Sequence, residues 1–130
     1  AHKLQVDPRV VVLDKTNART LTMAEIPEAP DLVVCDASFI SLKLVLPAAM
    51  QLAKDGAYLI ALIKPQFEVG RENIGKGGVV RDTALHDAVC ADIQNWLTDT
   101  GWQVLGLATS PITGPAGNKE FLVYAQKAAR

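Results

Sequence analysis

The chain has 130 residues, with 13 Lys and Arg against 14 Asp and Glu, and a formal net charge of -1. The length suits one ordinary domain. The 49% hydrophobic and 21% charged content is that of an average globular protein, which excludes intrinsic disorder and fibrous structure. The balanced charge lacks the basic excess of a nucleic-acid-binding domain. The longest apolar run, 56–63, is far shorter than the ~20 residues of a membrane helix.

Three apolar runs predict the first strands of the fold. They are RVVVLD at 9–14, DLVVCD at 31–36 and AYLIALIK at 57–64. None of them alternates apolar with polar residues, which is typical of parallel strands that helices cover on both faces. Each run ends in an ionisable residue.

A helix is predicted between the second and third runs. Apolar residues recur at helical spacing over 41–54, with Ser38 or Ser41 as the N-cap and Gly56 as the stop. Pro47 falls inside this segment and lacks a backbone N–H. The helix is therefore expected either to begin just before Pro47 or to kink there.

The rest of the chain predicts one more helix and two strands. The helix spans about 83–100, with Asp82 or Thr83 as its cap, and the strands span 102–108 and 120–125. The loop between these two strands is too short for a parallel crossover, so they should pair antiparallel. The alternation of strands and helices predicts an open α/β sheet.

The two cysteines, Cys35 and Cys90, lie outside any C-x-x-C motif. A disulfide between them is arithmetically possible, but two buried thiols in a cytoplasmic protein is the better interpretation. His2 and His86 are far apart in the sequence. No metal site is therefore expected.

Four ionisable residues should converge on one edge of the sheet. Asp14, Asp36 and Lys64 end the three parallel strands, and Glu120 begins the last strand, which should run antiparallel. Ligands of open α/β sheets bind at the carboxyl ends of the strands. Taken singly, each acid could be an ordinary cap or turn residue and the lysine simply solvated. The 17-residue loop 65–81, with four glycines, is long enough to be functional, although a mobile surface loop is the alternative.

Four segments together resemble a known family. They are DPRVVVLDKTNAR (7–19), DLVVCDASFISL (31–42), ALIKPQFEVGR (61–71) and SPITGPAGNKEFLVYA (110–125). In this order they resemble the TlyA family of FtsJ-type ribosomal RNA methyltransferases, whose members are often labelled hemolysin A.

The resemblance implies a function and roles for residues. Family members use S-adenosylmethionine to methylate ribose 2'-hydroxyls of cytidine in ribosomal RNA or ribosomal subunits, in the cytoplasm. By motif, Asp36, Lys64 and Glu120 match three members of a Lys-Asp-Lys-Glu catalytic set. Asp14 matches the acid that holds the cofactor ribose, and Asp36 also faces the cofactor. The carboxylates should keep Lys64 charged, so it would steer the hydroxyl and stabilise the developing alkoxide rather than act as a base.

The resemblance also implies what lies outside this chain. Residues 1–130 would form a truncated FtsJ-like domain with a partial Rossmann-like, class I methyltransferase fold. The RNA-binding domain, the first strand and the glycine-rich cofactor loop would be absent, so the chain alone should be inactive and bind S-adenosylmethionine poorly.

Loss of that central first strand should expose the edge of the 31–36 strand. The 9–14 strand could move into the vacant place, two chains could pair there as a homo-oligomer, or a further segment could fill it.

Two other functions stay open from the sequence. One is a methyltransferase that acts on something other than RNA, although many small-molecule methyltransferases lack the lysine at position 64. The other is a membrane-active haemolysin, but the sequence has no membrane span and no long basic amphipathic helix.

Overall fold

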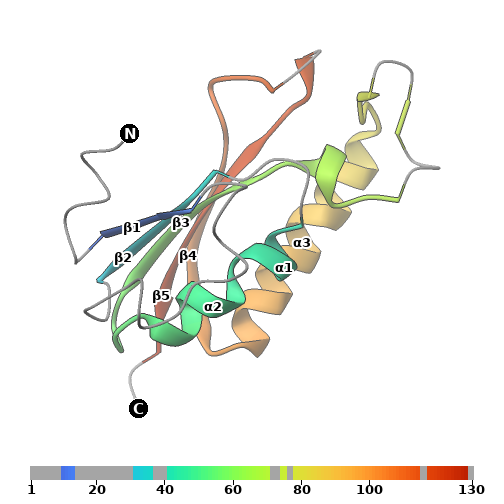
Figure 1. The fold of residues 1–130 in the computed structure, drawn as a ribbon. Helices are drawn as coiled ribbons and strands as arrows, with labels where there is room; N and C mark the ends of the chain where they lie inside the picture. Colours follow the sequence, from blue (N-terminus) through green and yellow to red (C-terminus); the bar gives the residue numbers. More distant parts are fainter. Residues whose placement is uncertain are drawn as a thin grey trace.

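Five strands form one mixed sheet in the computed structural model (Figure 1), which describes residues 10–13, 31–36, 41–70, 74–75, 78–114 and 117–128. The strands are β1 (Val10–Leu13), β2 (Leu32–Cys35), β3 (Tyr58–Ile63), β4 (Trp102–Thr109) and β5 (Phe121–Lys127). β1, β2 and β3 run parallel, β5 runs antiparallel to β3, and β4 runs antiparallel to β5. The order β1-β2-β3-β5-β4 confirms the predicted α/β sheet, in which only the last strand in sequence is reversed.

The predicted helix over 41–54 is split in two. α1 (Leu42–Val45) is capped by the Ser41 side chain, and α2 (Pro47–Leu52) begins with the proline at its first position. A proline inside a helix cannot donate a hydrogen bond to the preceding turn, whereas at the first helical position no such bond is required. The break at Leu46 therefore follows directly from Pro47.

α3 (Thr83–Asp99) forms as predicted. The Asp82 side chain accepts a hydrogen bond from the backbone N–H of Ala84 at 2.9 Å and so caps the first turn. Gly101 follows the helix with a φ of 93°, a conformation that suits glycine and ends the helix.

The core lies between the helices and one face of the sheet. α1, α2 and α3 all lie on that face (Figure 1). Alternate strand residues point into this layer and are buried, among them Val33, Leu59, Ile63 and Val123. The intervening residues are only partly buried or exposed in the described part of the chain, as the burial alternation in β2 and β3 shows. The prediction of burial on both faces is therefore not met by the described elements.

β1 pairs directly with β2 along its full length, with Val10 opposite Leu32 and Leu13 opposite Cys35. The edge of β2 that was expected to lie open is thus occupied by β1, which is the first of the three arrangements considered. Pairing satisfies the backbone N–H and C=O groups that an open central edge would leave to solvent.

Candidate functional site

Lys64 and Asp36 meet at the carboxyl ends of β3 and β2. The parallel register sets Cys35 opposite Ala61, so the residues that follow each strand emerge at the same edge. Nζ of Lys64 lies 2.6 Å from Oδ1 of Asp36, and the side chains are 11% and 61% exposed. A buried ammonium needs a partner of opposite charge, and the accessible carboxylate supplies it while still facing solvent.

Glu120 reaches the same edge from the antiparallel strand. Ile63 is opposite Phe121, so Glu120 immediately precedes β5 at the point where Lys64 immediately follows β3. The Glu120 side chain is 7% exposed and accepts a hydrogen bond from Nε2 of Gln66 at 3.0 Å. The structure therefore brings Asp36, Lys64 and Glu120 to one edge, while Asp14 lies outside the described residues.

Gln66 and Glu68 belong to this edge, although the sequence did not single out a role for either. Both lie just after Lys64, at the short 3-10 helix η3 (Pro65–Phe67). Glu68 accepts hydrogen bonds from Oγ of Ser41 at 2.6 Å and from the backbone N–H of Leu42 at 2.8 Å. Burial raises the pKa of the Glu68 carboxyl, and these two hydrogen bonds counteract part of that shift. The position of Lys64 at the end of a strand could have pointed to Gln66 and Glu68 as its neighbours. No local sequence pattern, however, identifies their hydrogen-bond partners, which lie 54 and 26 residues away.

A second polar cluster joins the two loops that flank the site. The buried Asn118 side chain accepts from the backbone N–H of Val80 and donates to the carbonyl of Gly78, both at 2.9 Å. The His86 ring nitrogen Nε2 lies 2.8 Å from the carbonyl oxygen of Val80. The loop before β5 is therefore fastened to the end of the long loop before α3.

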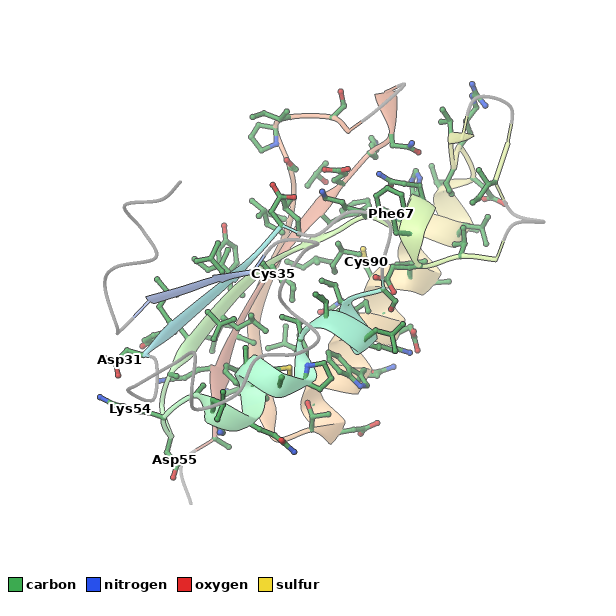
Figure 2. All side chains as sticks on the ribbon, viewed as in Figure 1. Asp31, Cys35, Lys54, Asp55, Phe67 and Cys90 are labelled. Atoms are coloured by element: carbon green, nitrogen blue, oxygen red, sulfur yellow. The ribbon has the colours of Figure 1, made fainter. Side chains whose placement is uncertain are left out.

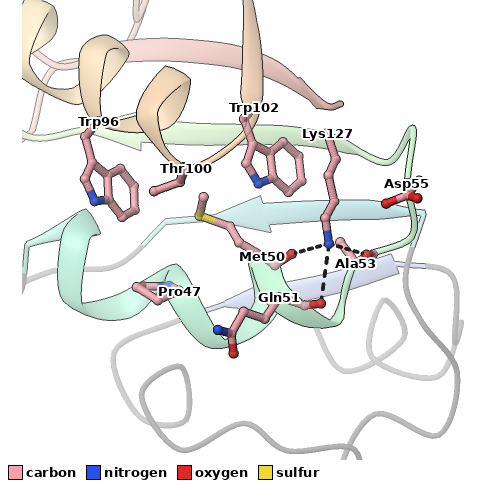
Figure 3. A pocket seen from close by; sticks show the side chains of 9 residues that line it. All are labelled: Pro47, Met50, Gln51, Ala53, Asp55, Trp96, Thr100, Trp102 and Lys127. Carbon is pink, nitrogen blue, oxygen red and sulfur yellow. Dashed lines mark hydrogen bonds between the residues drawn. The ribbon is translucent and has the colours of Figure 1, made fainter. Parts of the chain in front are cut away.

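A cavity of about 620 Å³ lies at the opposite edge of the sheet (Figure 3). Trp96, Trp102 and Lys127 are among its lining residues. The Lys127 ammonium donates to carbonyls at the end of α2, at 2.9 Å to Met50 and 2.7 Å to Ala53. Lys127 caps the end of α2, so its position in the cavity wall is explained by helix capping. The cavity is also remote from Lys64.

Figure 2 shows Asp31, Lys54 and Asp55 at that same far end, away from Cys35 and Phe67. Cys35 and Cys90 are buried thiols, as expected in preference to a disulfide. Over the described ranges, no cluster of His, Cys, Asp and Glu could hold a metal ion. Nor is any described helix long and apolar enough to cross a membrane.

A mixed sheet of this topology, with polar side chains at the carboxyl ends of its parallel strands, has the Rossmann-like fold of class I S-adenosylmethionine-dependent methyltransferases. The chain belongs to the FtsJ-like methyltransferase family, whose profile matches residues 1–127.

Three known proteins are similar to this chain. The chain is 46% identical over 124 residues to the 16S/23S rRNA (cytidine-2'-O)-methyltransferase TlyA of Mycobacterium tuberculosis, covering 95% of this chain and 46% of that protein. Among solved structures, a protein described as a hemolysin from Streptococcus thermophilus is 40% identical, with a TM-score of 0.84 over 98% of this chain and 46% of that one. A second such protein, from Lactococcus lactis, is 39% identical, with a TM-score of 0.82 over 100% and 65%. The chain spans about half the length of the curated relative.

Proposed function

We propose that this chain forms much of the catalytic domain of a methyltransferase that modifies ribose 2'-hydroxyls of cytidine in ribosomal RNA. One observation carries the proposal. The shielded Lys64 ammonium is held 2.6 Å from Asp36 at a strand edge that Glu120 also reaches. The rRNA methyltransferase relative supports the choice of substrate.

The residues at this edge fit a bound S-adenosylmethionine. Ligands of open α/β sheets lie beyond the carboxyl ends of the parallel strands, where Asp36 stands. One oxygen of Asp36 contacts Lys64, and 61% of its side chain stays accessible to a ligand. Asp14, the residue after β1 in the sequence, would hold the cofactor ribose. When bound, S-adenosylmethionine supplies a methyl group on a sulfonium for an in-line displacement on that carbon.

Lys64 acts on the other reactant, the ribose. Its ammonium donates a hydrogen bond to the 2'-oxygen and orients the oxygen lone pair toward the reacting carbon. As the hydroxyl proton leaves to water, the same ammonium stabilises the negative charge that develops on the oxygen. Asp36 holds the ammonium in place from a distance of 2.6 Å.

The natural substrate is larger than this chain can grip alone. The net charge of -1 offers few phosphate contacts, whereas RNA binding depends strongly on Lys and Arg. We place the remaining RNA contacts, the glycine-rich cofactor loop and the first catalytic lysine in the part of a relative-sized protein that precedes this chain. Such a protein would work in the cytoplasm on ribosomal RNA or ribosomal subunits.

The test compares two lysine substitutions in the full-length protein. Lys64→Met should reduce methyl transfer from labelled S-adenosylmethionine to ribosomal subunits by roughly 100-fold or more. Lys54→Met is the matched control, because Lys54 pairs with Asp31 at 3.5 Å at the far end of the sheet and is half exposed. Wild-type rates in Lys64→Met, or equal losses in both variants, would refute the proposed role.

A separate measurement tests whether the segment before this chain is needed to bind the cofactor. Calorimetry should show weak or undetectable binding of S-adenosylmethionine to the 130-residue chain and clear binding to the full-length protein. A micromolar dissociation constant for the chain alone would refute the proposal that the cofactor-binding loop precedes this chain.

A further inference from the structure

The Glu120 carboxylate is enclosed by two loops that are far apart in the sequence. From one side, Nε2 of Gln66 donates to Oε2 of Glu120 at 3.0 Å. From the other side, the backbone of Gly114 closes on the same group. A Cβ added to Gly114 would overlap Oε2 of Glu120 and would lie 2.8 Å from its Cδ and 3.3 Å from Nε2 of Gln66. The carboxylate therefore sits in a tight polar cradle.

Gln66 is a costly residue for this position. It is 6% exposed, and its amide oxygen Oε1 is buried with no hydrogen-bond partner among the described residues. An unpaired buried carbonyl loses its hydration and gains nothing in return. A methionine of similar shape would avoid the loss at Oε1, but it would leave the buried Glu120 carboxylate without its Nε2 donor.

The amide nitrogen of Gln66 makes the contact that explains a glutamine here. A buried carboxylate oxygen held by an N–H donor keeps one orientation, and the donor lies only two residues after Lys64. Gln66 thus links the orientation of Glu120 to the backbone that carries the lysine. Gly114 fixes the same orientation from the opposite side, because any side chain there would displace the carboxylate.

We propose that Gln66 and Gly114 are positioning residues that hold the Glu120 carboxylate in its working orientation beside Lys64. The inference rests on the proposed methyltransferase function. Neither residue is expected to touch the substrate, so both act through Glu120.

Enzyme kinetics in the full-length protein test this role. Gln66→Met and Gly114→Ala should each lower kcat for methyl transfer roughly 10- to 100-fold, with little change in KM for RNA or S-adenosylmethionine. Gly106→Ala is the matched control, because its added Cβ would meet only Cδ2 of Tyr124 at an ordinary 3.6 Å. It should keep the wild-type kcat.

One further readout separates positioning from a structural role. In a Glu120→Gln background, Gln66→Met should cause no further loss of kcat. A wild-type kcat in Gln66→Met, or a further loss of the same size in the Glu120→Gln background, would overturn the inference.

The outcomes also distinguish this inference from the proposed function. If Lys64→Met is inactive and Gln66→Met is fully active, only the positioning role fails. If the wild-type protein transfers no methyl group, the crystal structure of Gln66→Met still shows whether Gln66 orients the Glu120 carboxylate. A changed Glu120 rotamer supports the cradle, and an unmoved carboxylate overturns it.

Discussion

Glu68 fastens the segment after Lys64 to the start of α1, and its removal should be measurable in stability. Its carboxylate accepts from Oγ of Ser41 at 2.6 Å and from the N–H of Leu42 at 2.8 Å. The first N–H groups of a helix have no partner within the helix, so an outside acceptor stabilises them. Glu68 supplies this cap from 26 residues away along the chain.

The expected cost of Glu68→Ala follows from these contacts. Loss of the acceptor for the Leu42 N–H costs about 1 kcal/mol, and loss of the hydrogen bond from the Ser41 hydroxyl adds about another 1 kcal/mol. Ionised Glu68 is itself disfavoured by burial, which offsets part of the loss near neutral pH. We therefore expect Glu68→Ala to destabilise the protein by about 1–2 kcal/mol, or about 4–8 °C in Tm for a domain of this size.

The pH dependence has a definite sign. Burial raises the pKa of Glu68 in the folded protein above its ordinary value, Asp92 adds to the shift, and Lys43 opposes it. The folded state then holds the proton more tightly than the unfolded state. The Glu68 contribution is thus fully present below the unfolded pKa and is lost as pH rises through the folded pKa. Relative to Glu68→Gln, the wild type should lose stability as pH rises from about 4.5 toward neutrality.

Thermal unfolding followed by circular dichroism at pH 4.5, 6 and 7.5 checks both expectations. Glu68→Gln serves as the isosteric control, because its amide can still accept from Leu42 and donate to Ser41. Two results would refute the reasoning. One is a Glu68→Ala melting temperature within 1–2 °C of wild type. The other is a difference between wild type and Glu68→Gln that does not change with pH.

Three further substitutions or treatments probe other contacts. Burial and the nearby charge of Asp87 raise the pKa of Cys90 to about 11, so iodoacetamide at pH 8 should label it roughly a hundredfold more slowly in the native than in the urea-unfolded protein; comparable rates would contradict this. Asn118→Ala removes hydrogen bonds to Val80 and Gly78 and should lower the unfolding free energy in urea by about 2–3 kcal/mol; a loss below about 1 kcal/mol would count against a structural role. Lys127→Met leaves the end of α2 without its donor and should cost about 1 kcal/mol in the same assay, whereas an unchanged midpoint would show that water replaces the ammonium fully.

The parts of the site that the sequence predicted are those that strand ends determine. A run of apolar residues defines a strand, and parallel neighbours in register deliver the residues after them to one edge. Asp36 and Lys64 follow such runs, and Glu120 begins a strand whose reversal was inferred from a short loop. These three positions needed only strand limits and direction, which hydrophobic pattern and loop length supply.

The parts that the sequence did not predict depend on contacts between loops. Gln66 and Glu68 stand in a segment with no periodicity, and their partners were 54 and 26–27 residues away. The break between α1 and α2 at Leu46 is caused by Pro47. From the sequence, the helix could either begin just before Pro47 or kink there. Helices were expected on both faces of the sheet, but one face of β2 and β3 is only partly buried or exposed. An apolar run predicts a strand but does not specify whether helices cover one of its faces or both.

These loop contacts imply that the site is assembled by three segments rather than by the sheet alone. Residues 65–70 carry Gln66 and Glu68, and the loop before β5 carries Gly114. The third segment, residues 78–82, is hydrogen-bonded to the Asn118 side chain. The backbone N–H of Gly114 donates to the carbonyl of Asn118 at 2.8 Å, so Asn118 supports the same turn that closes on Glu120. A substitution at Asn118 should therefore reach the carboxylate through Gly114, although Asn118 makes its side-chain bonds elsewhere. If so, Asn118→Ala would lower methyl transfer more than its loss of stability predicts, and restoring stability with a distant substitution would not restore the rate.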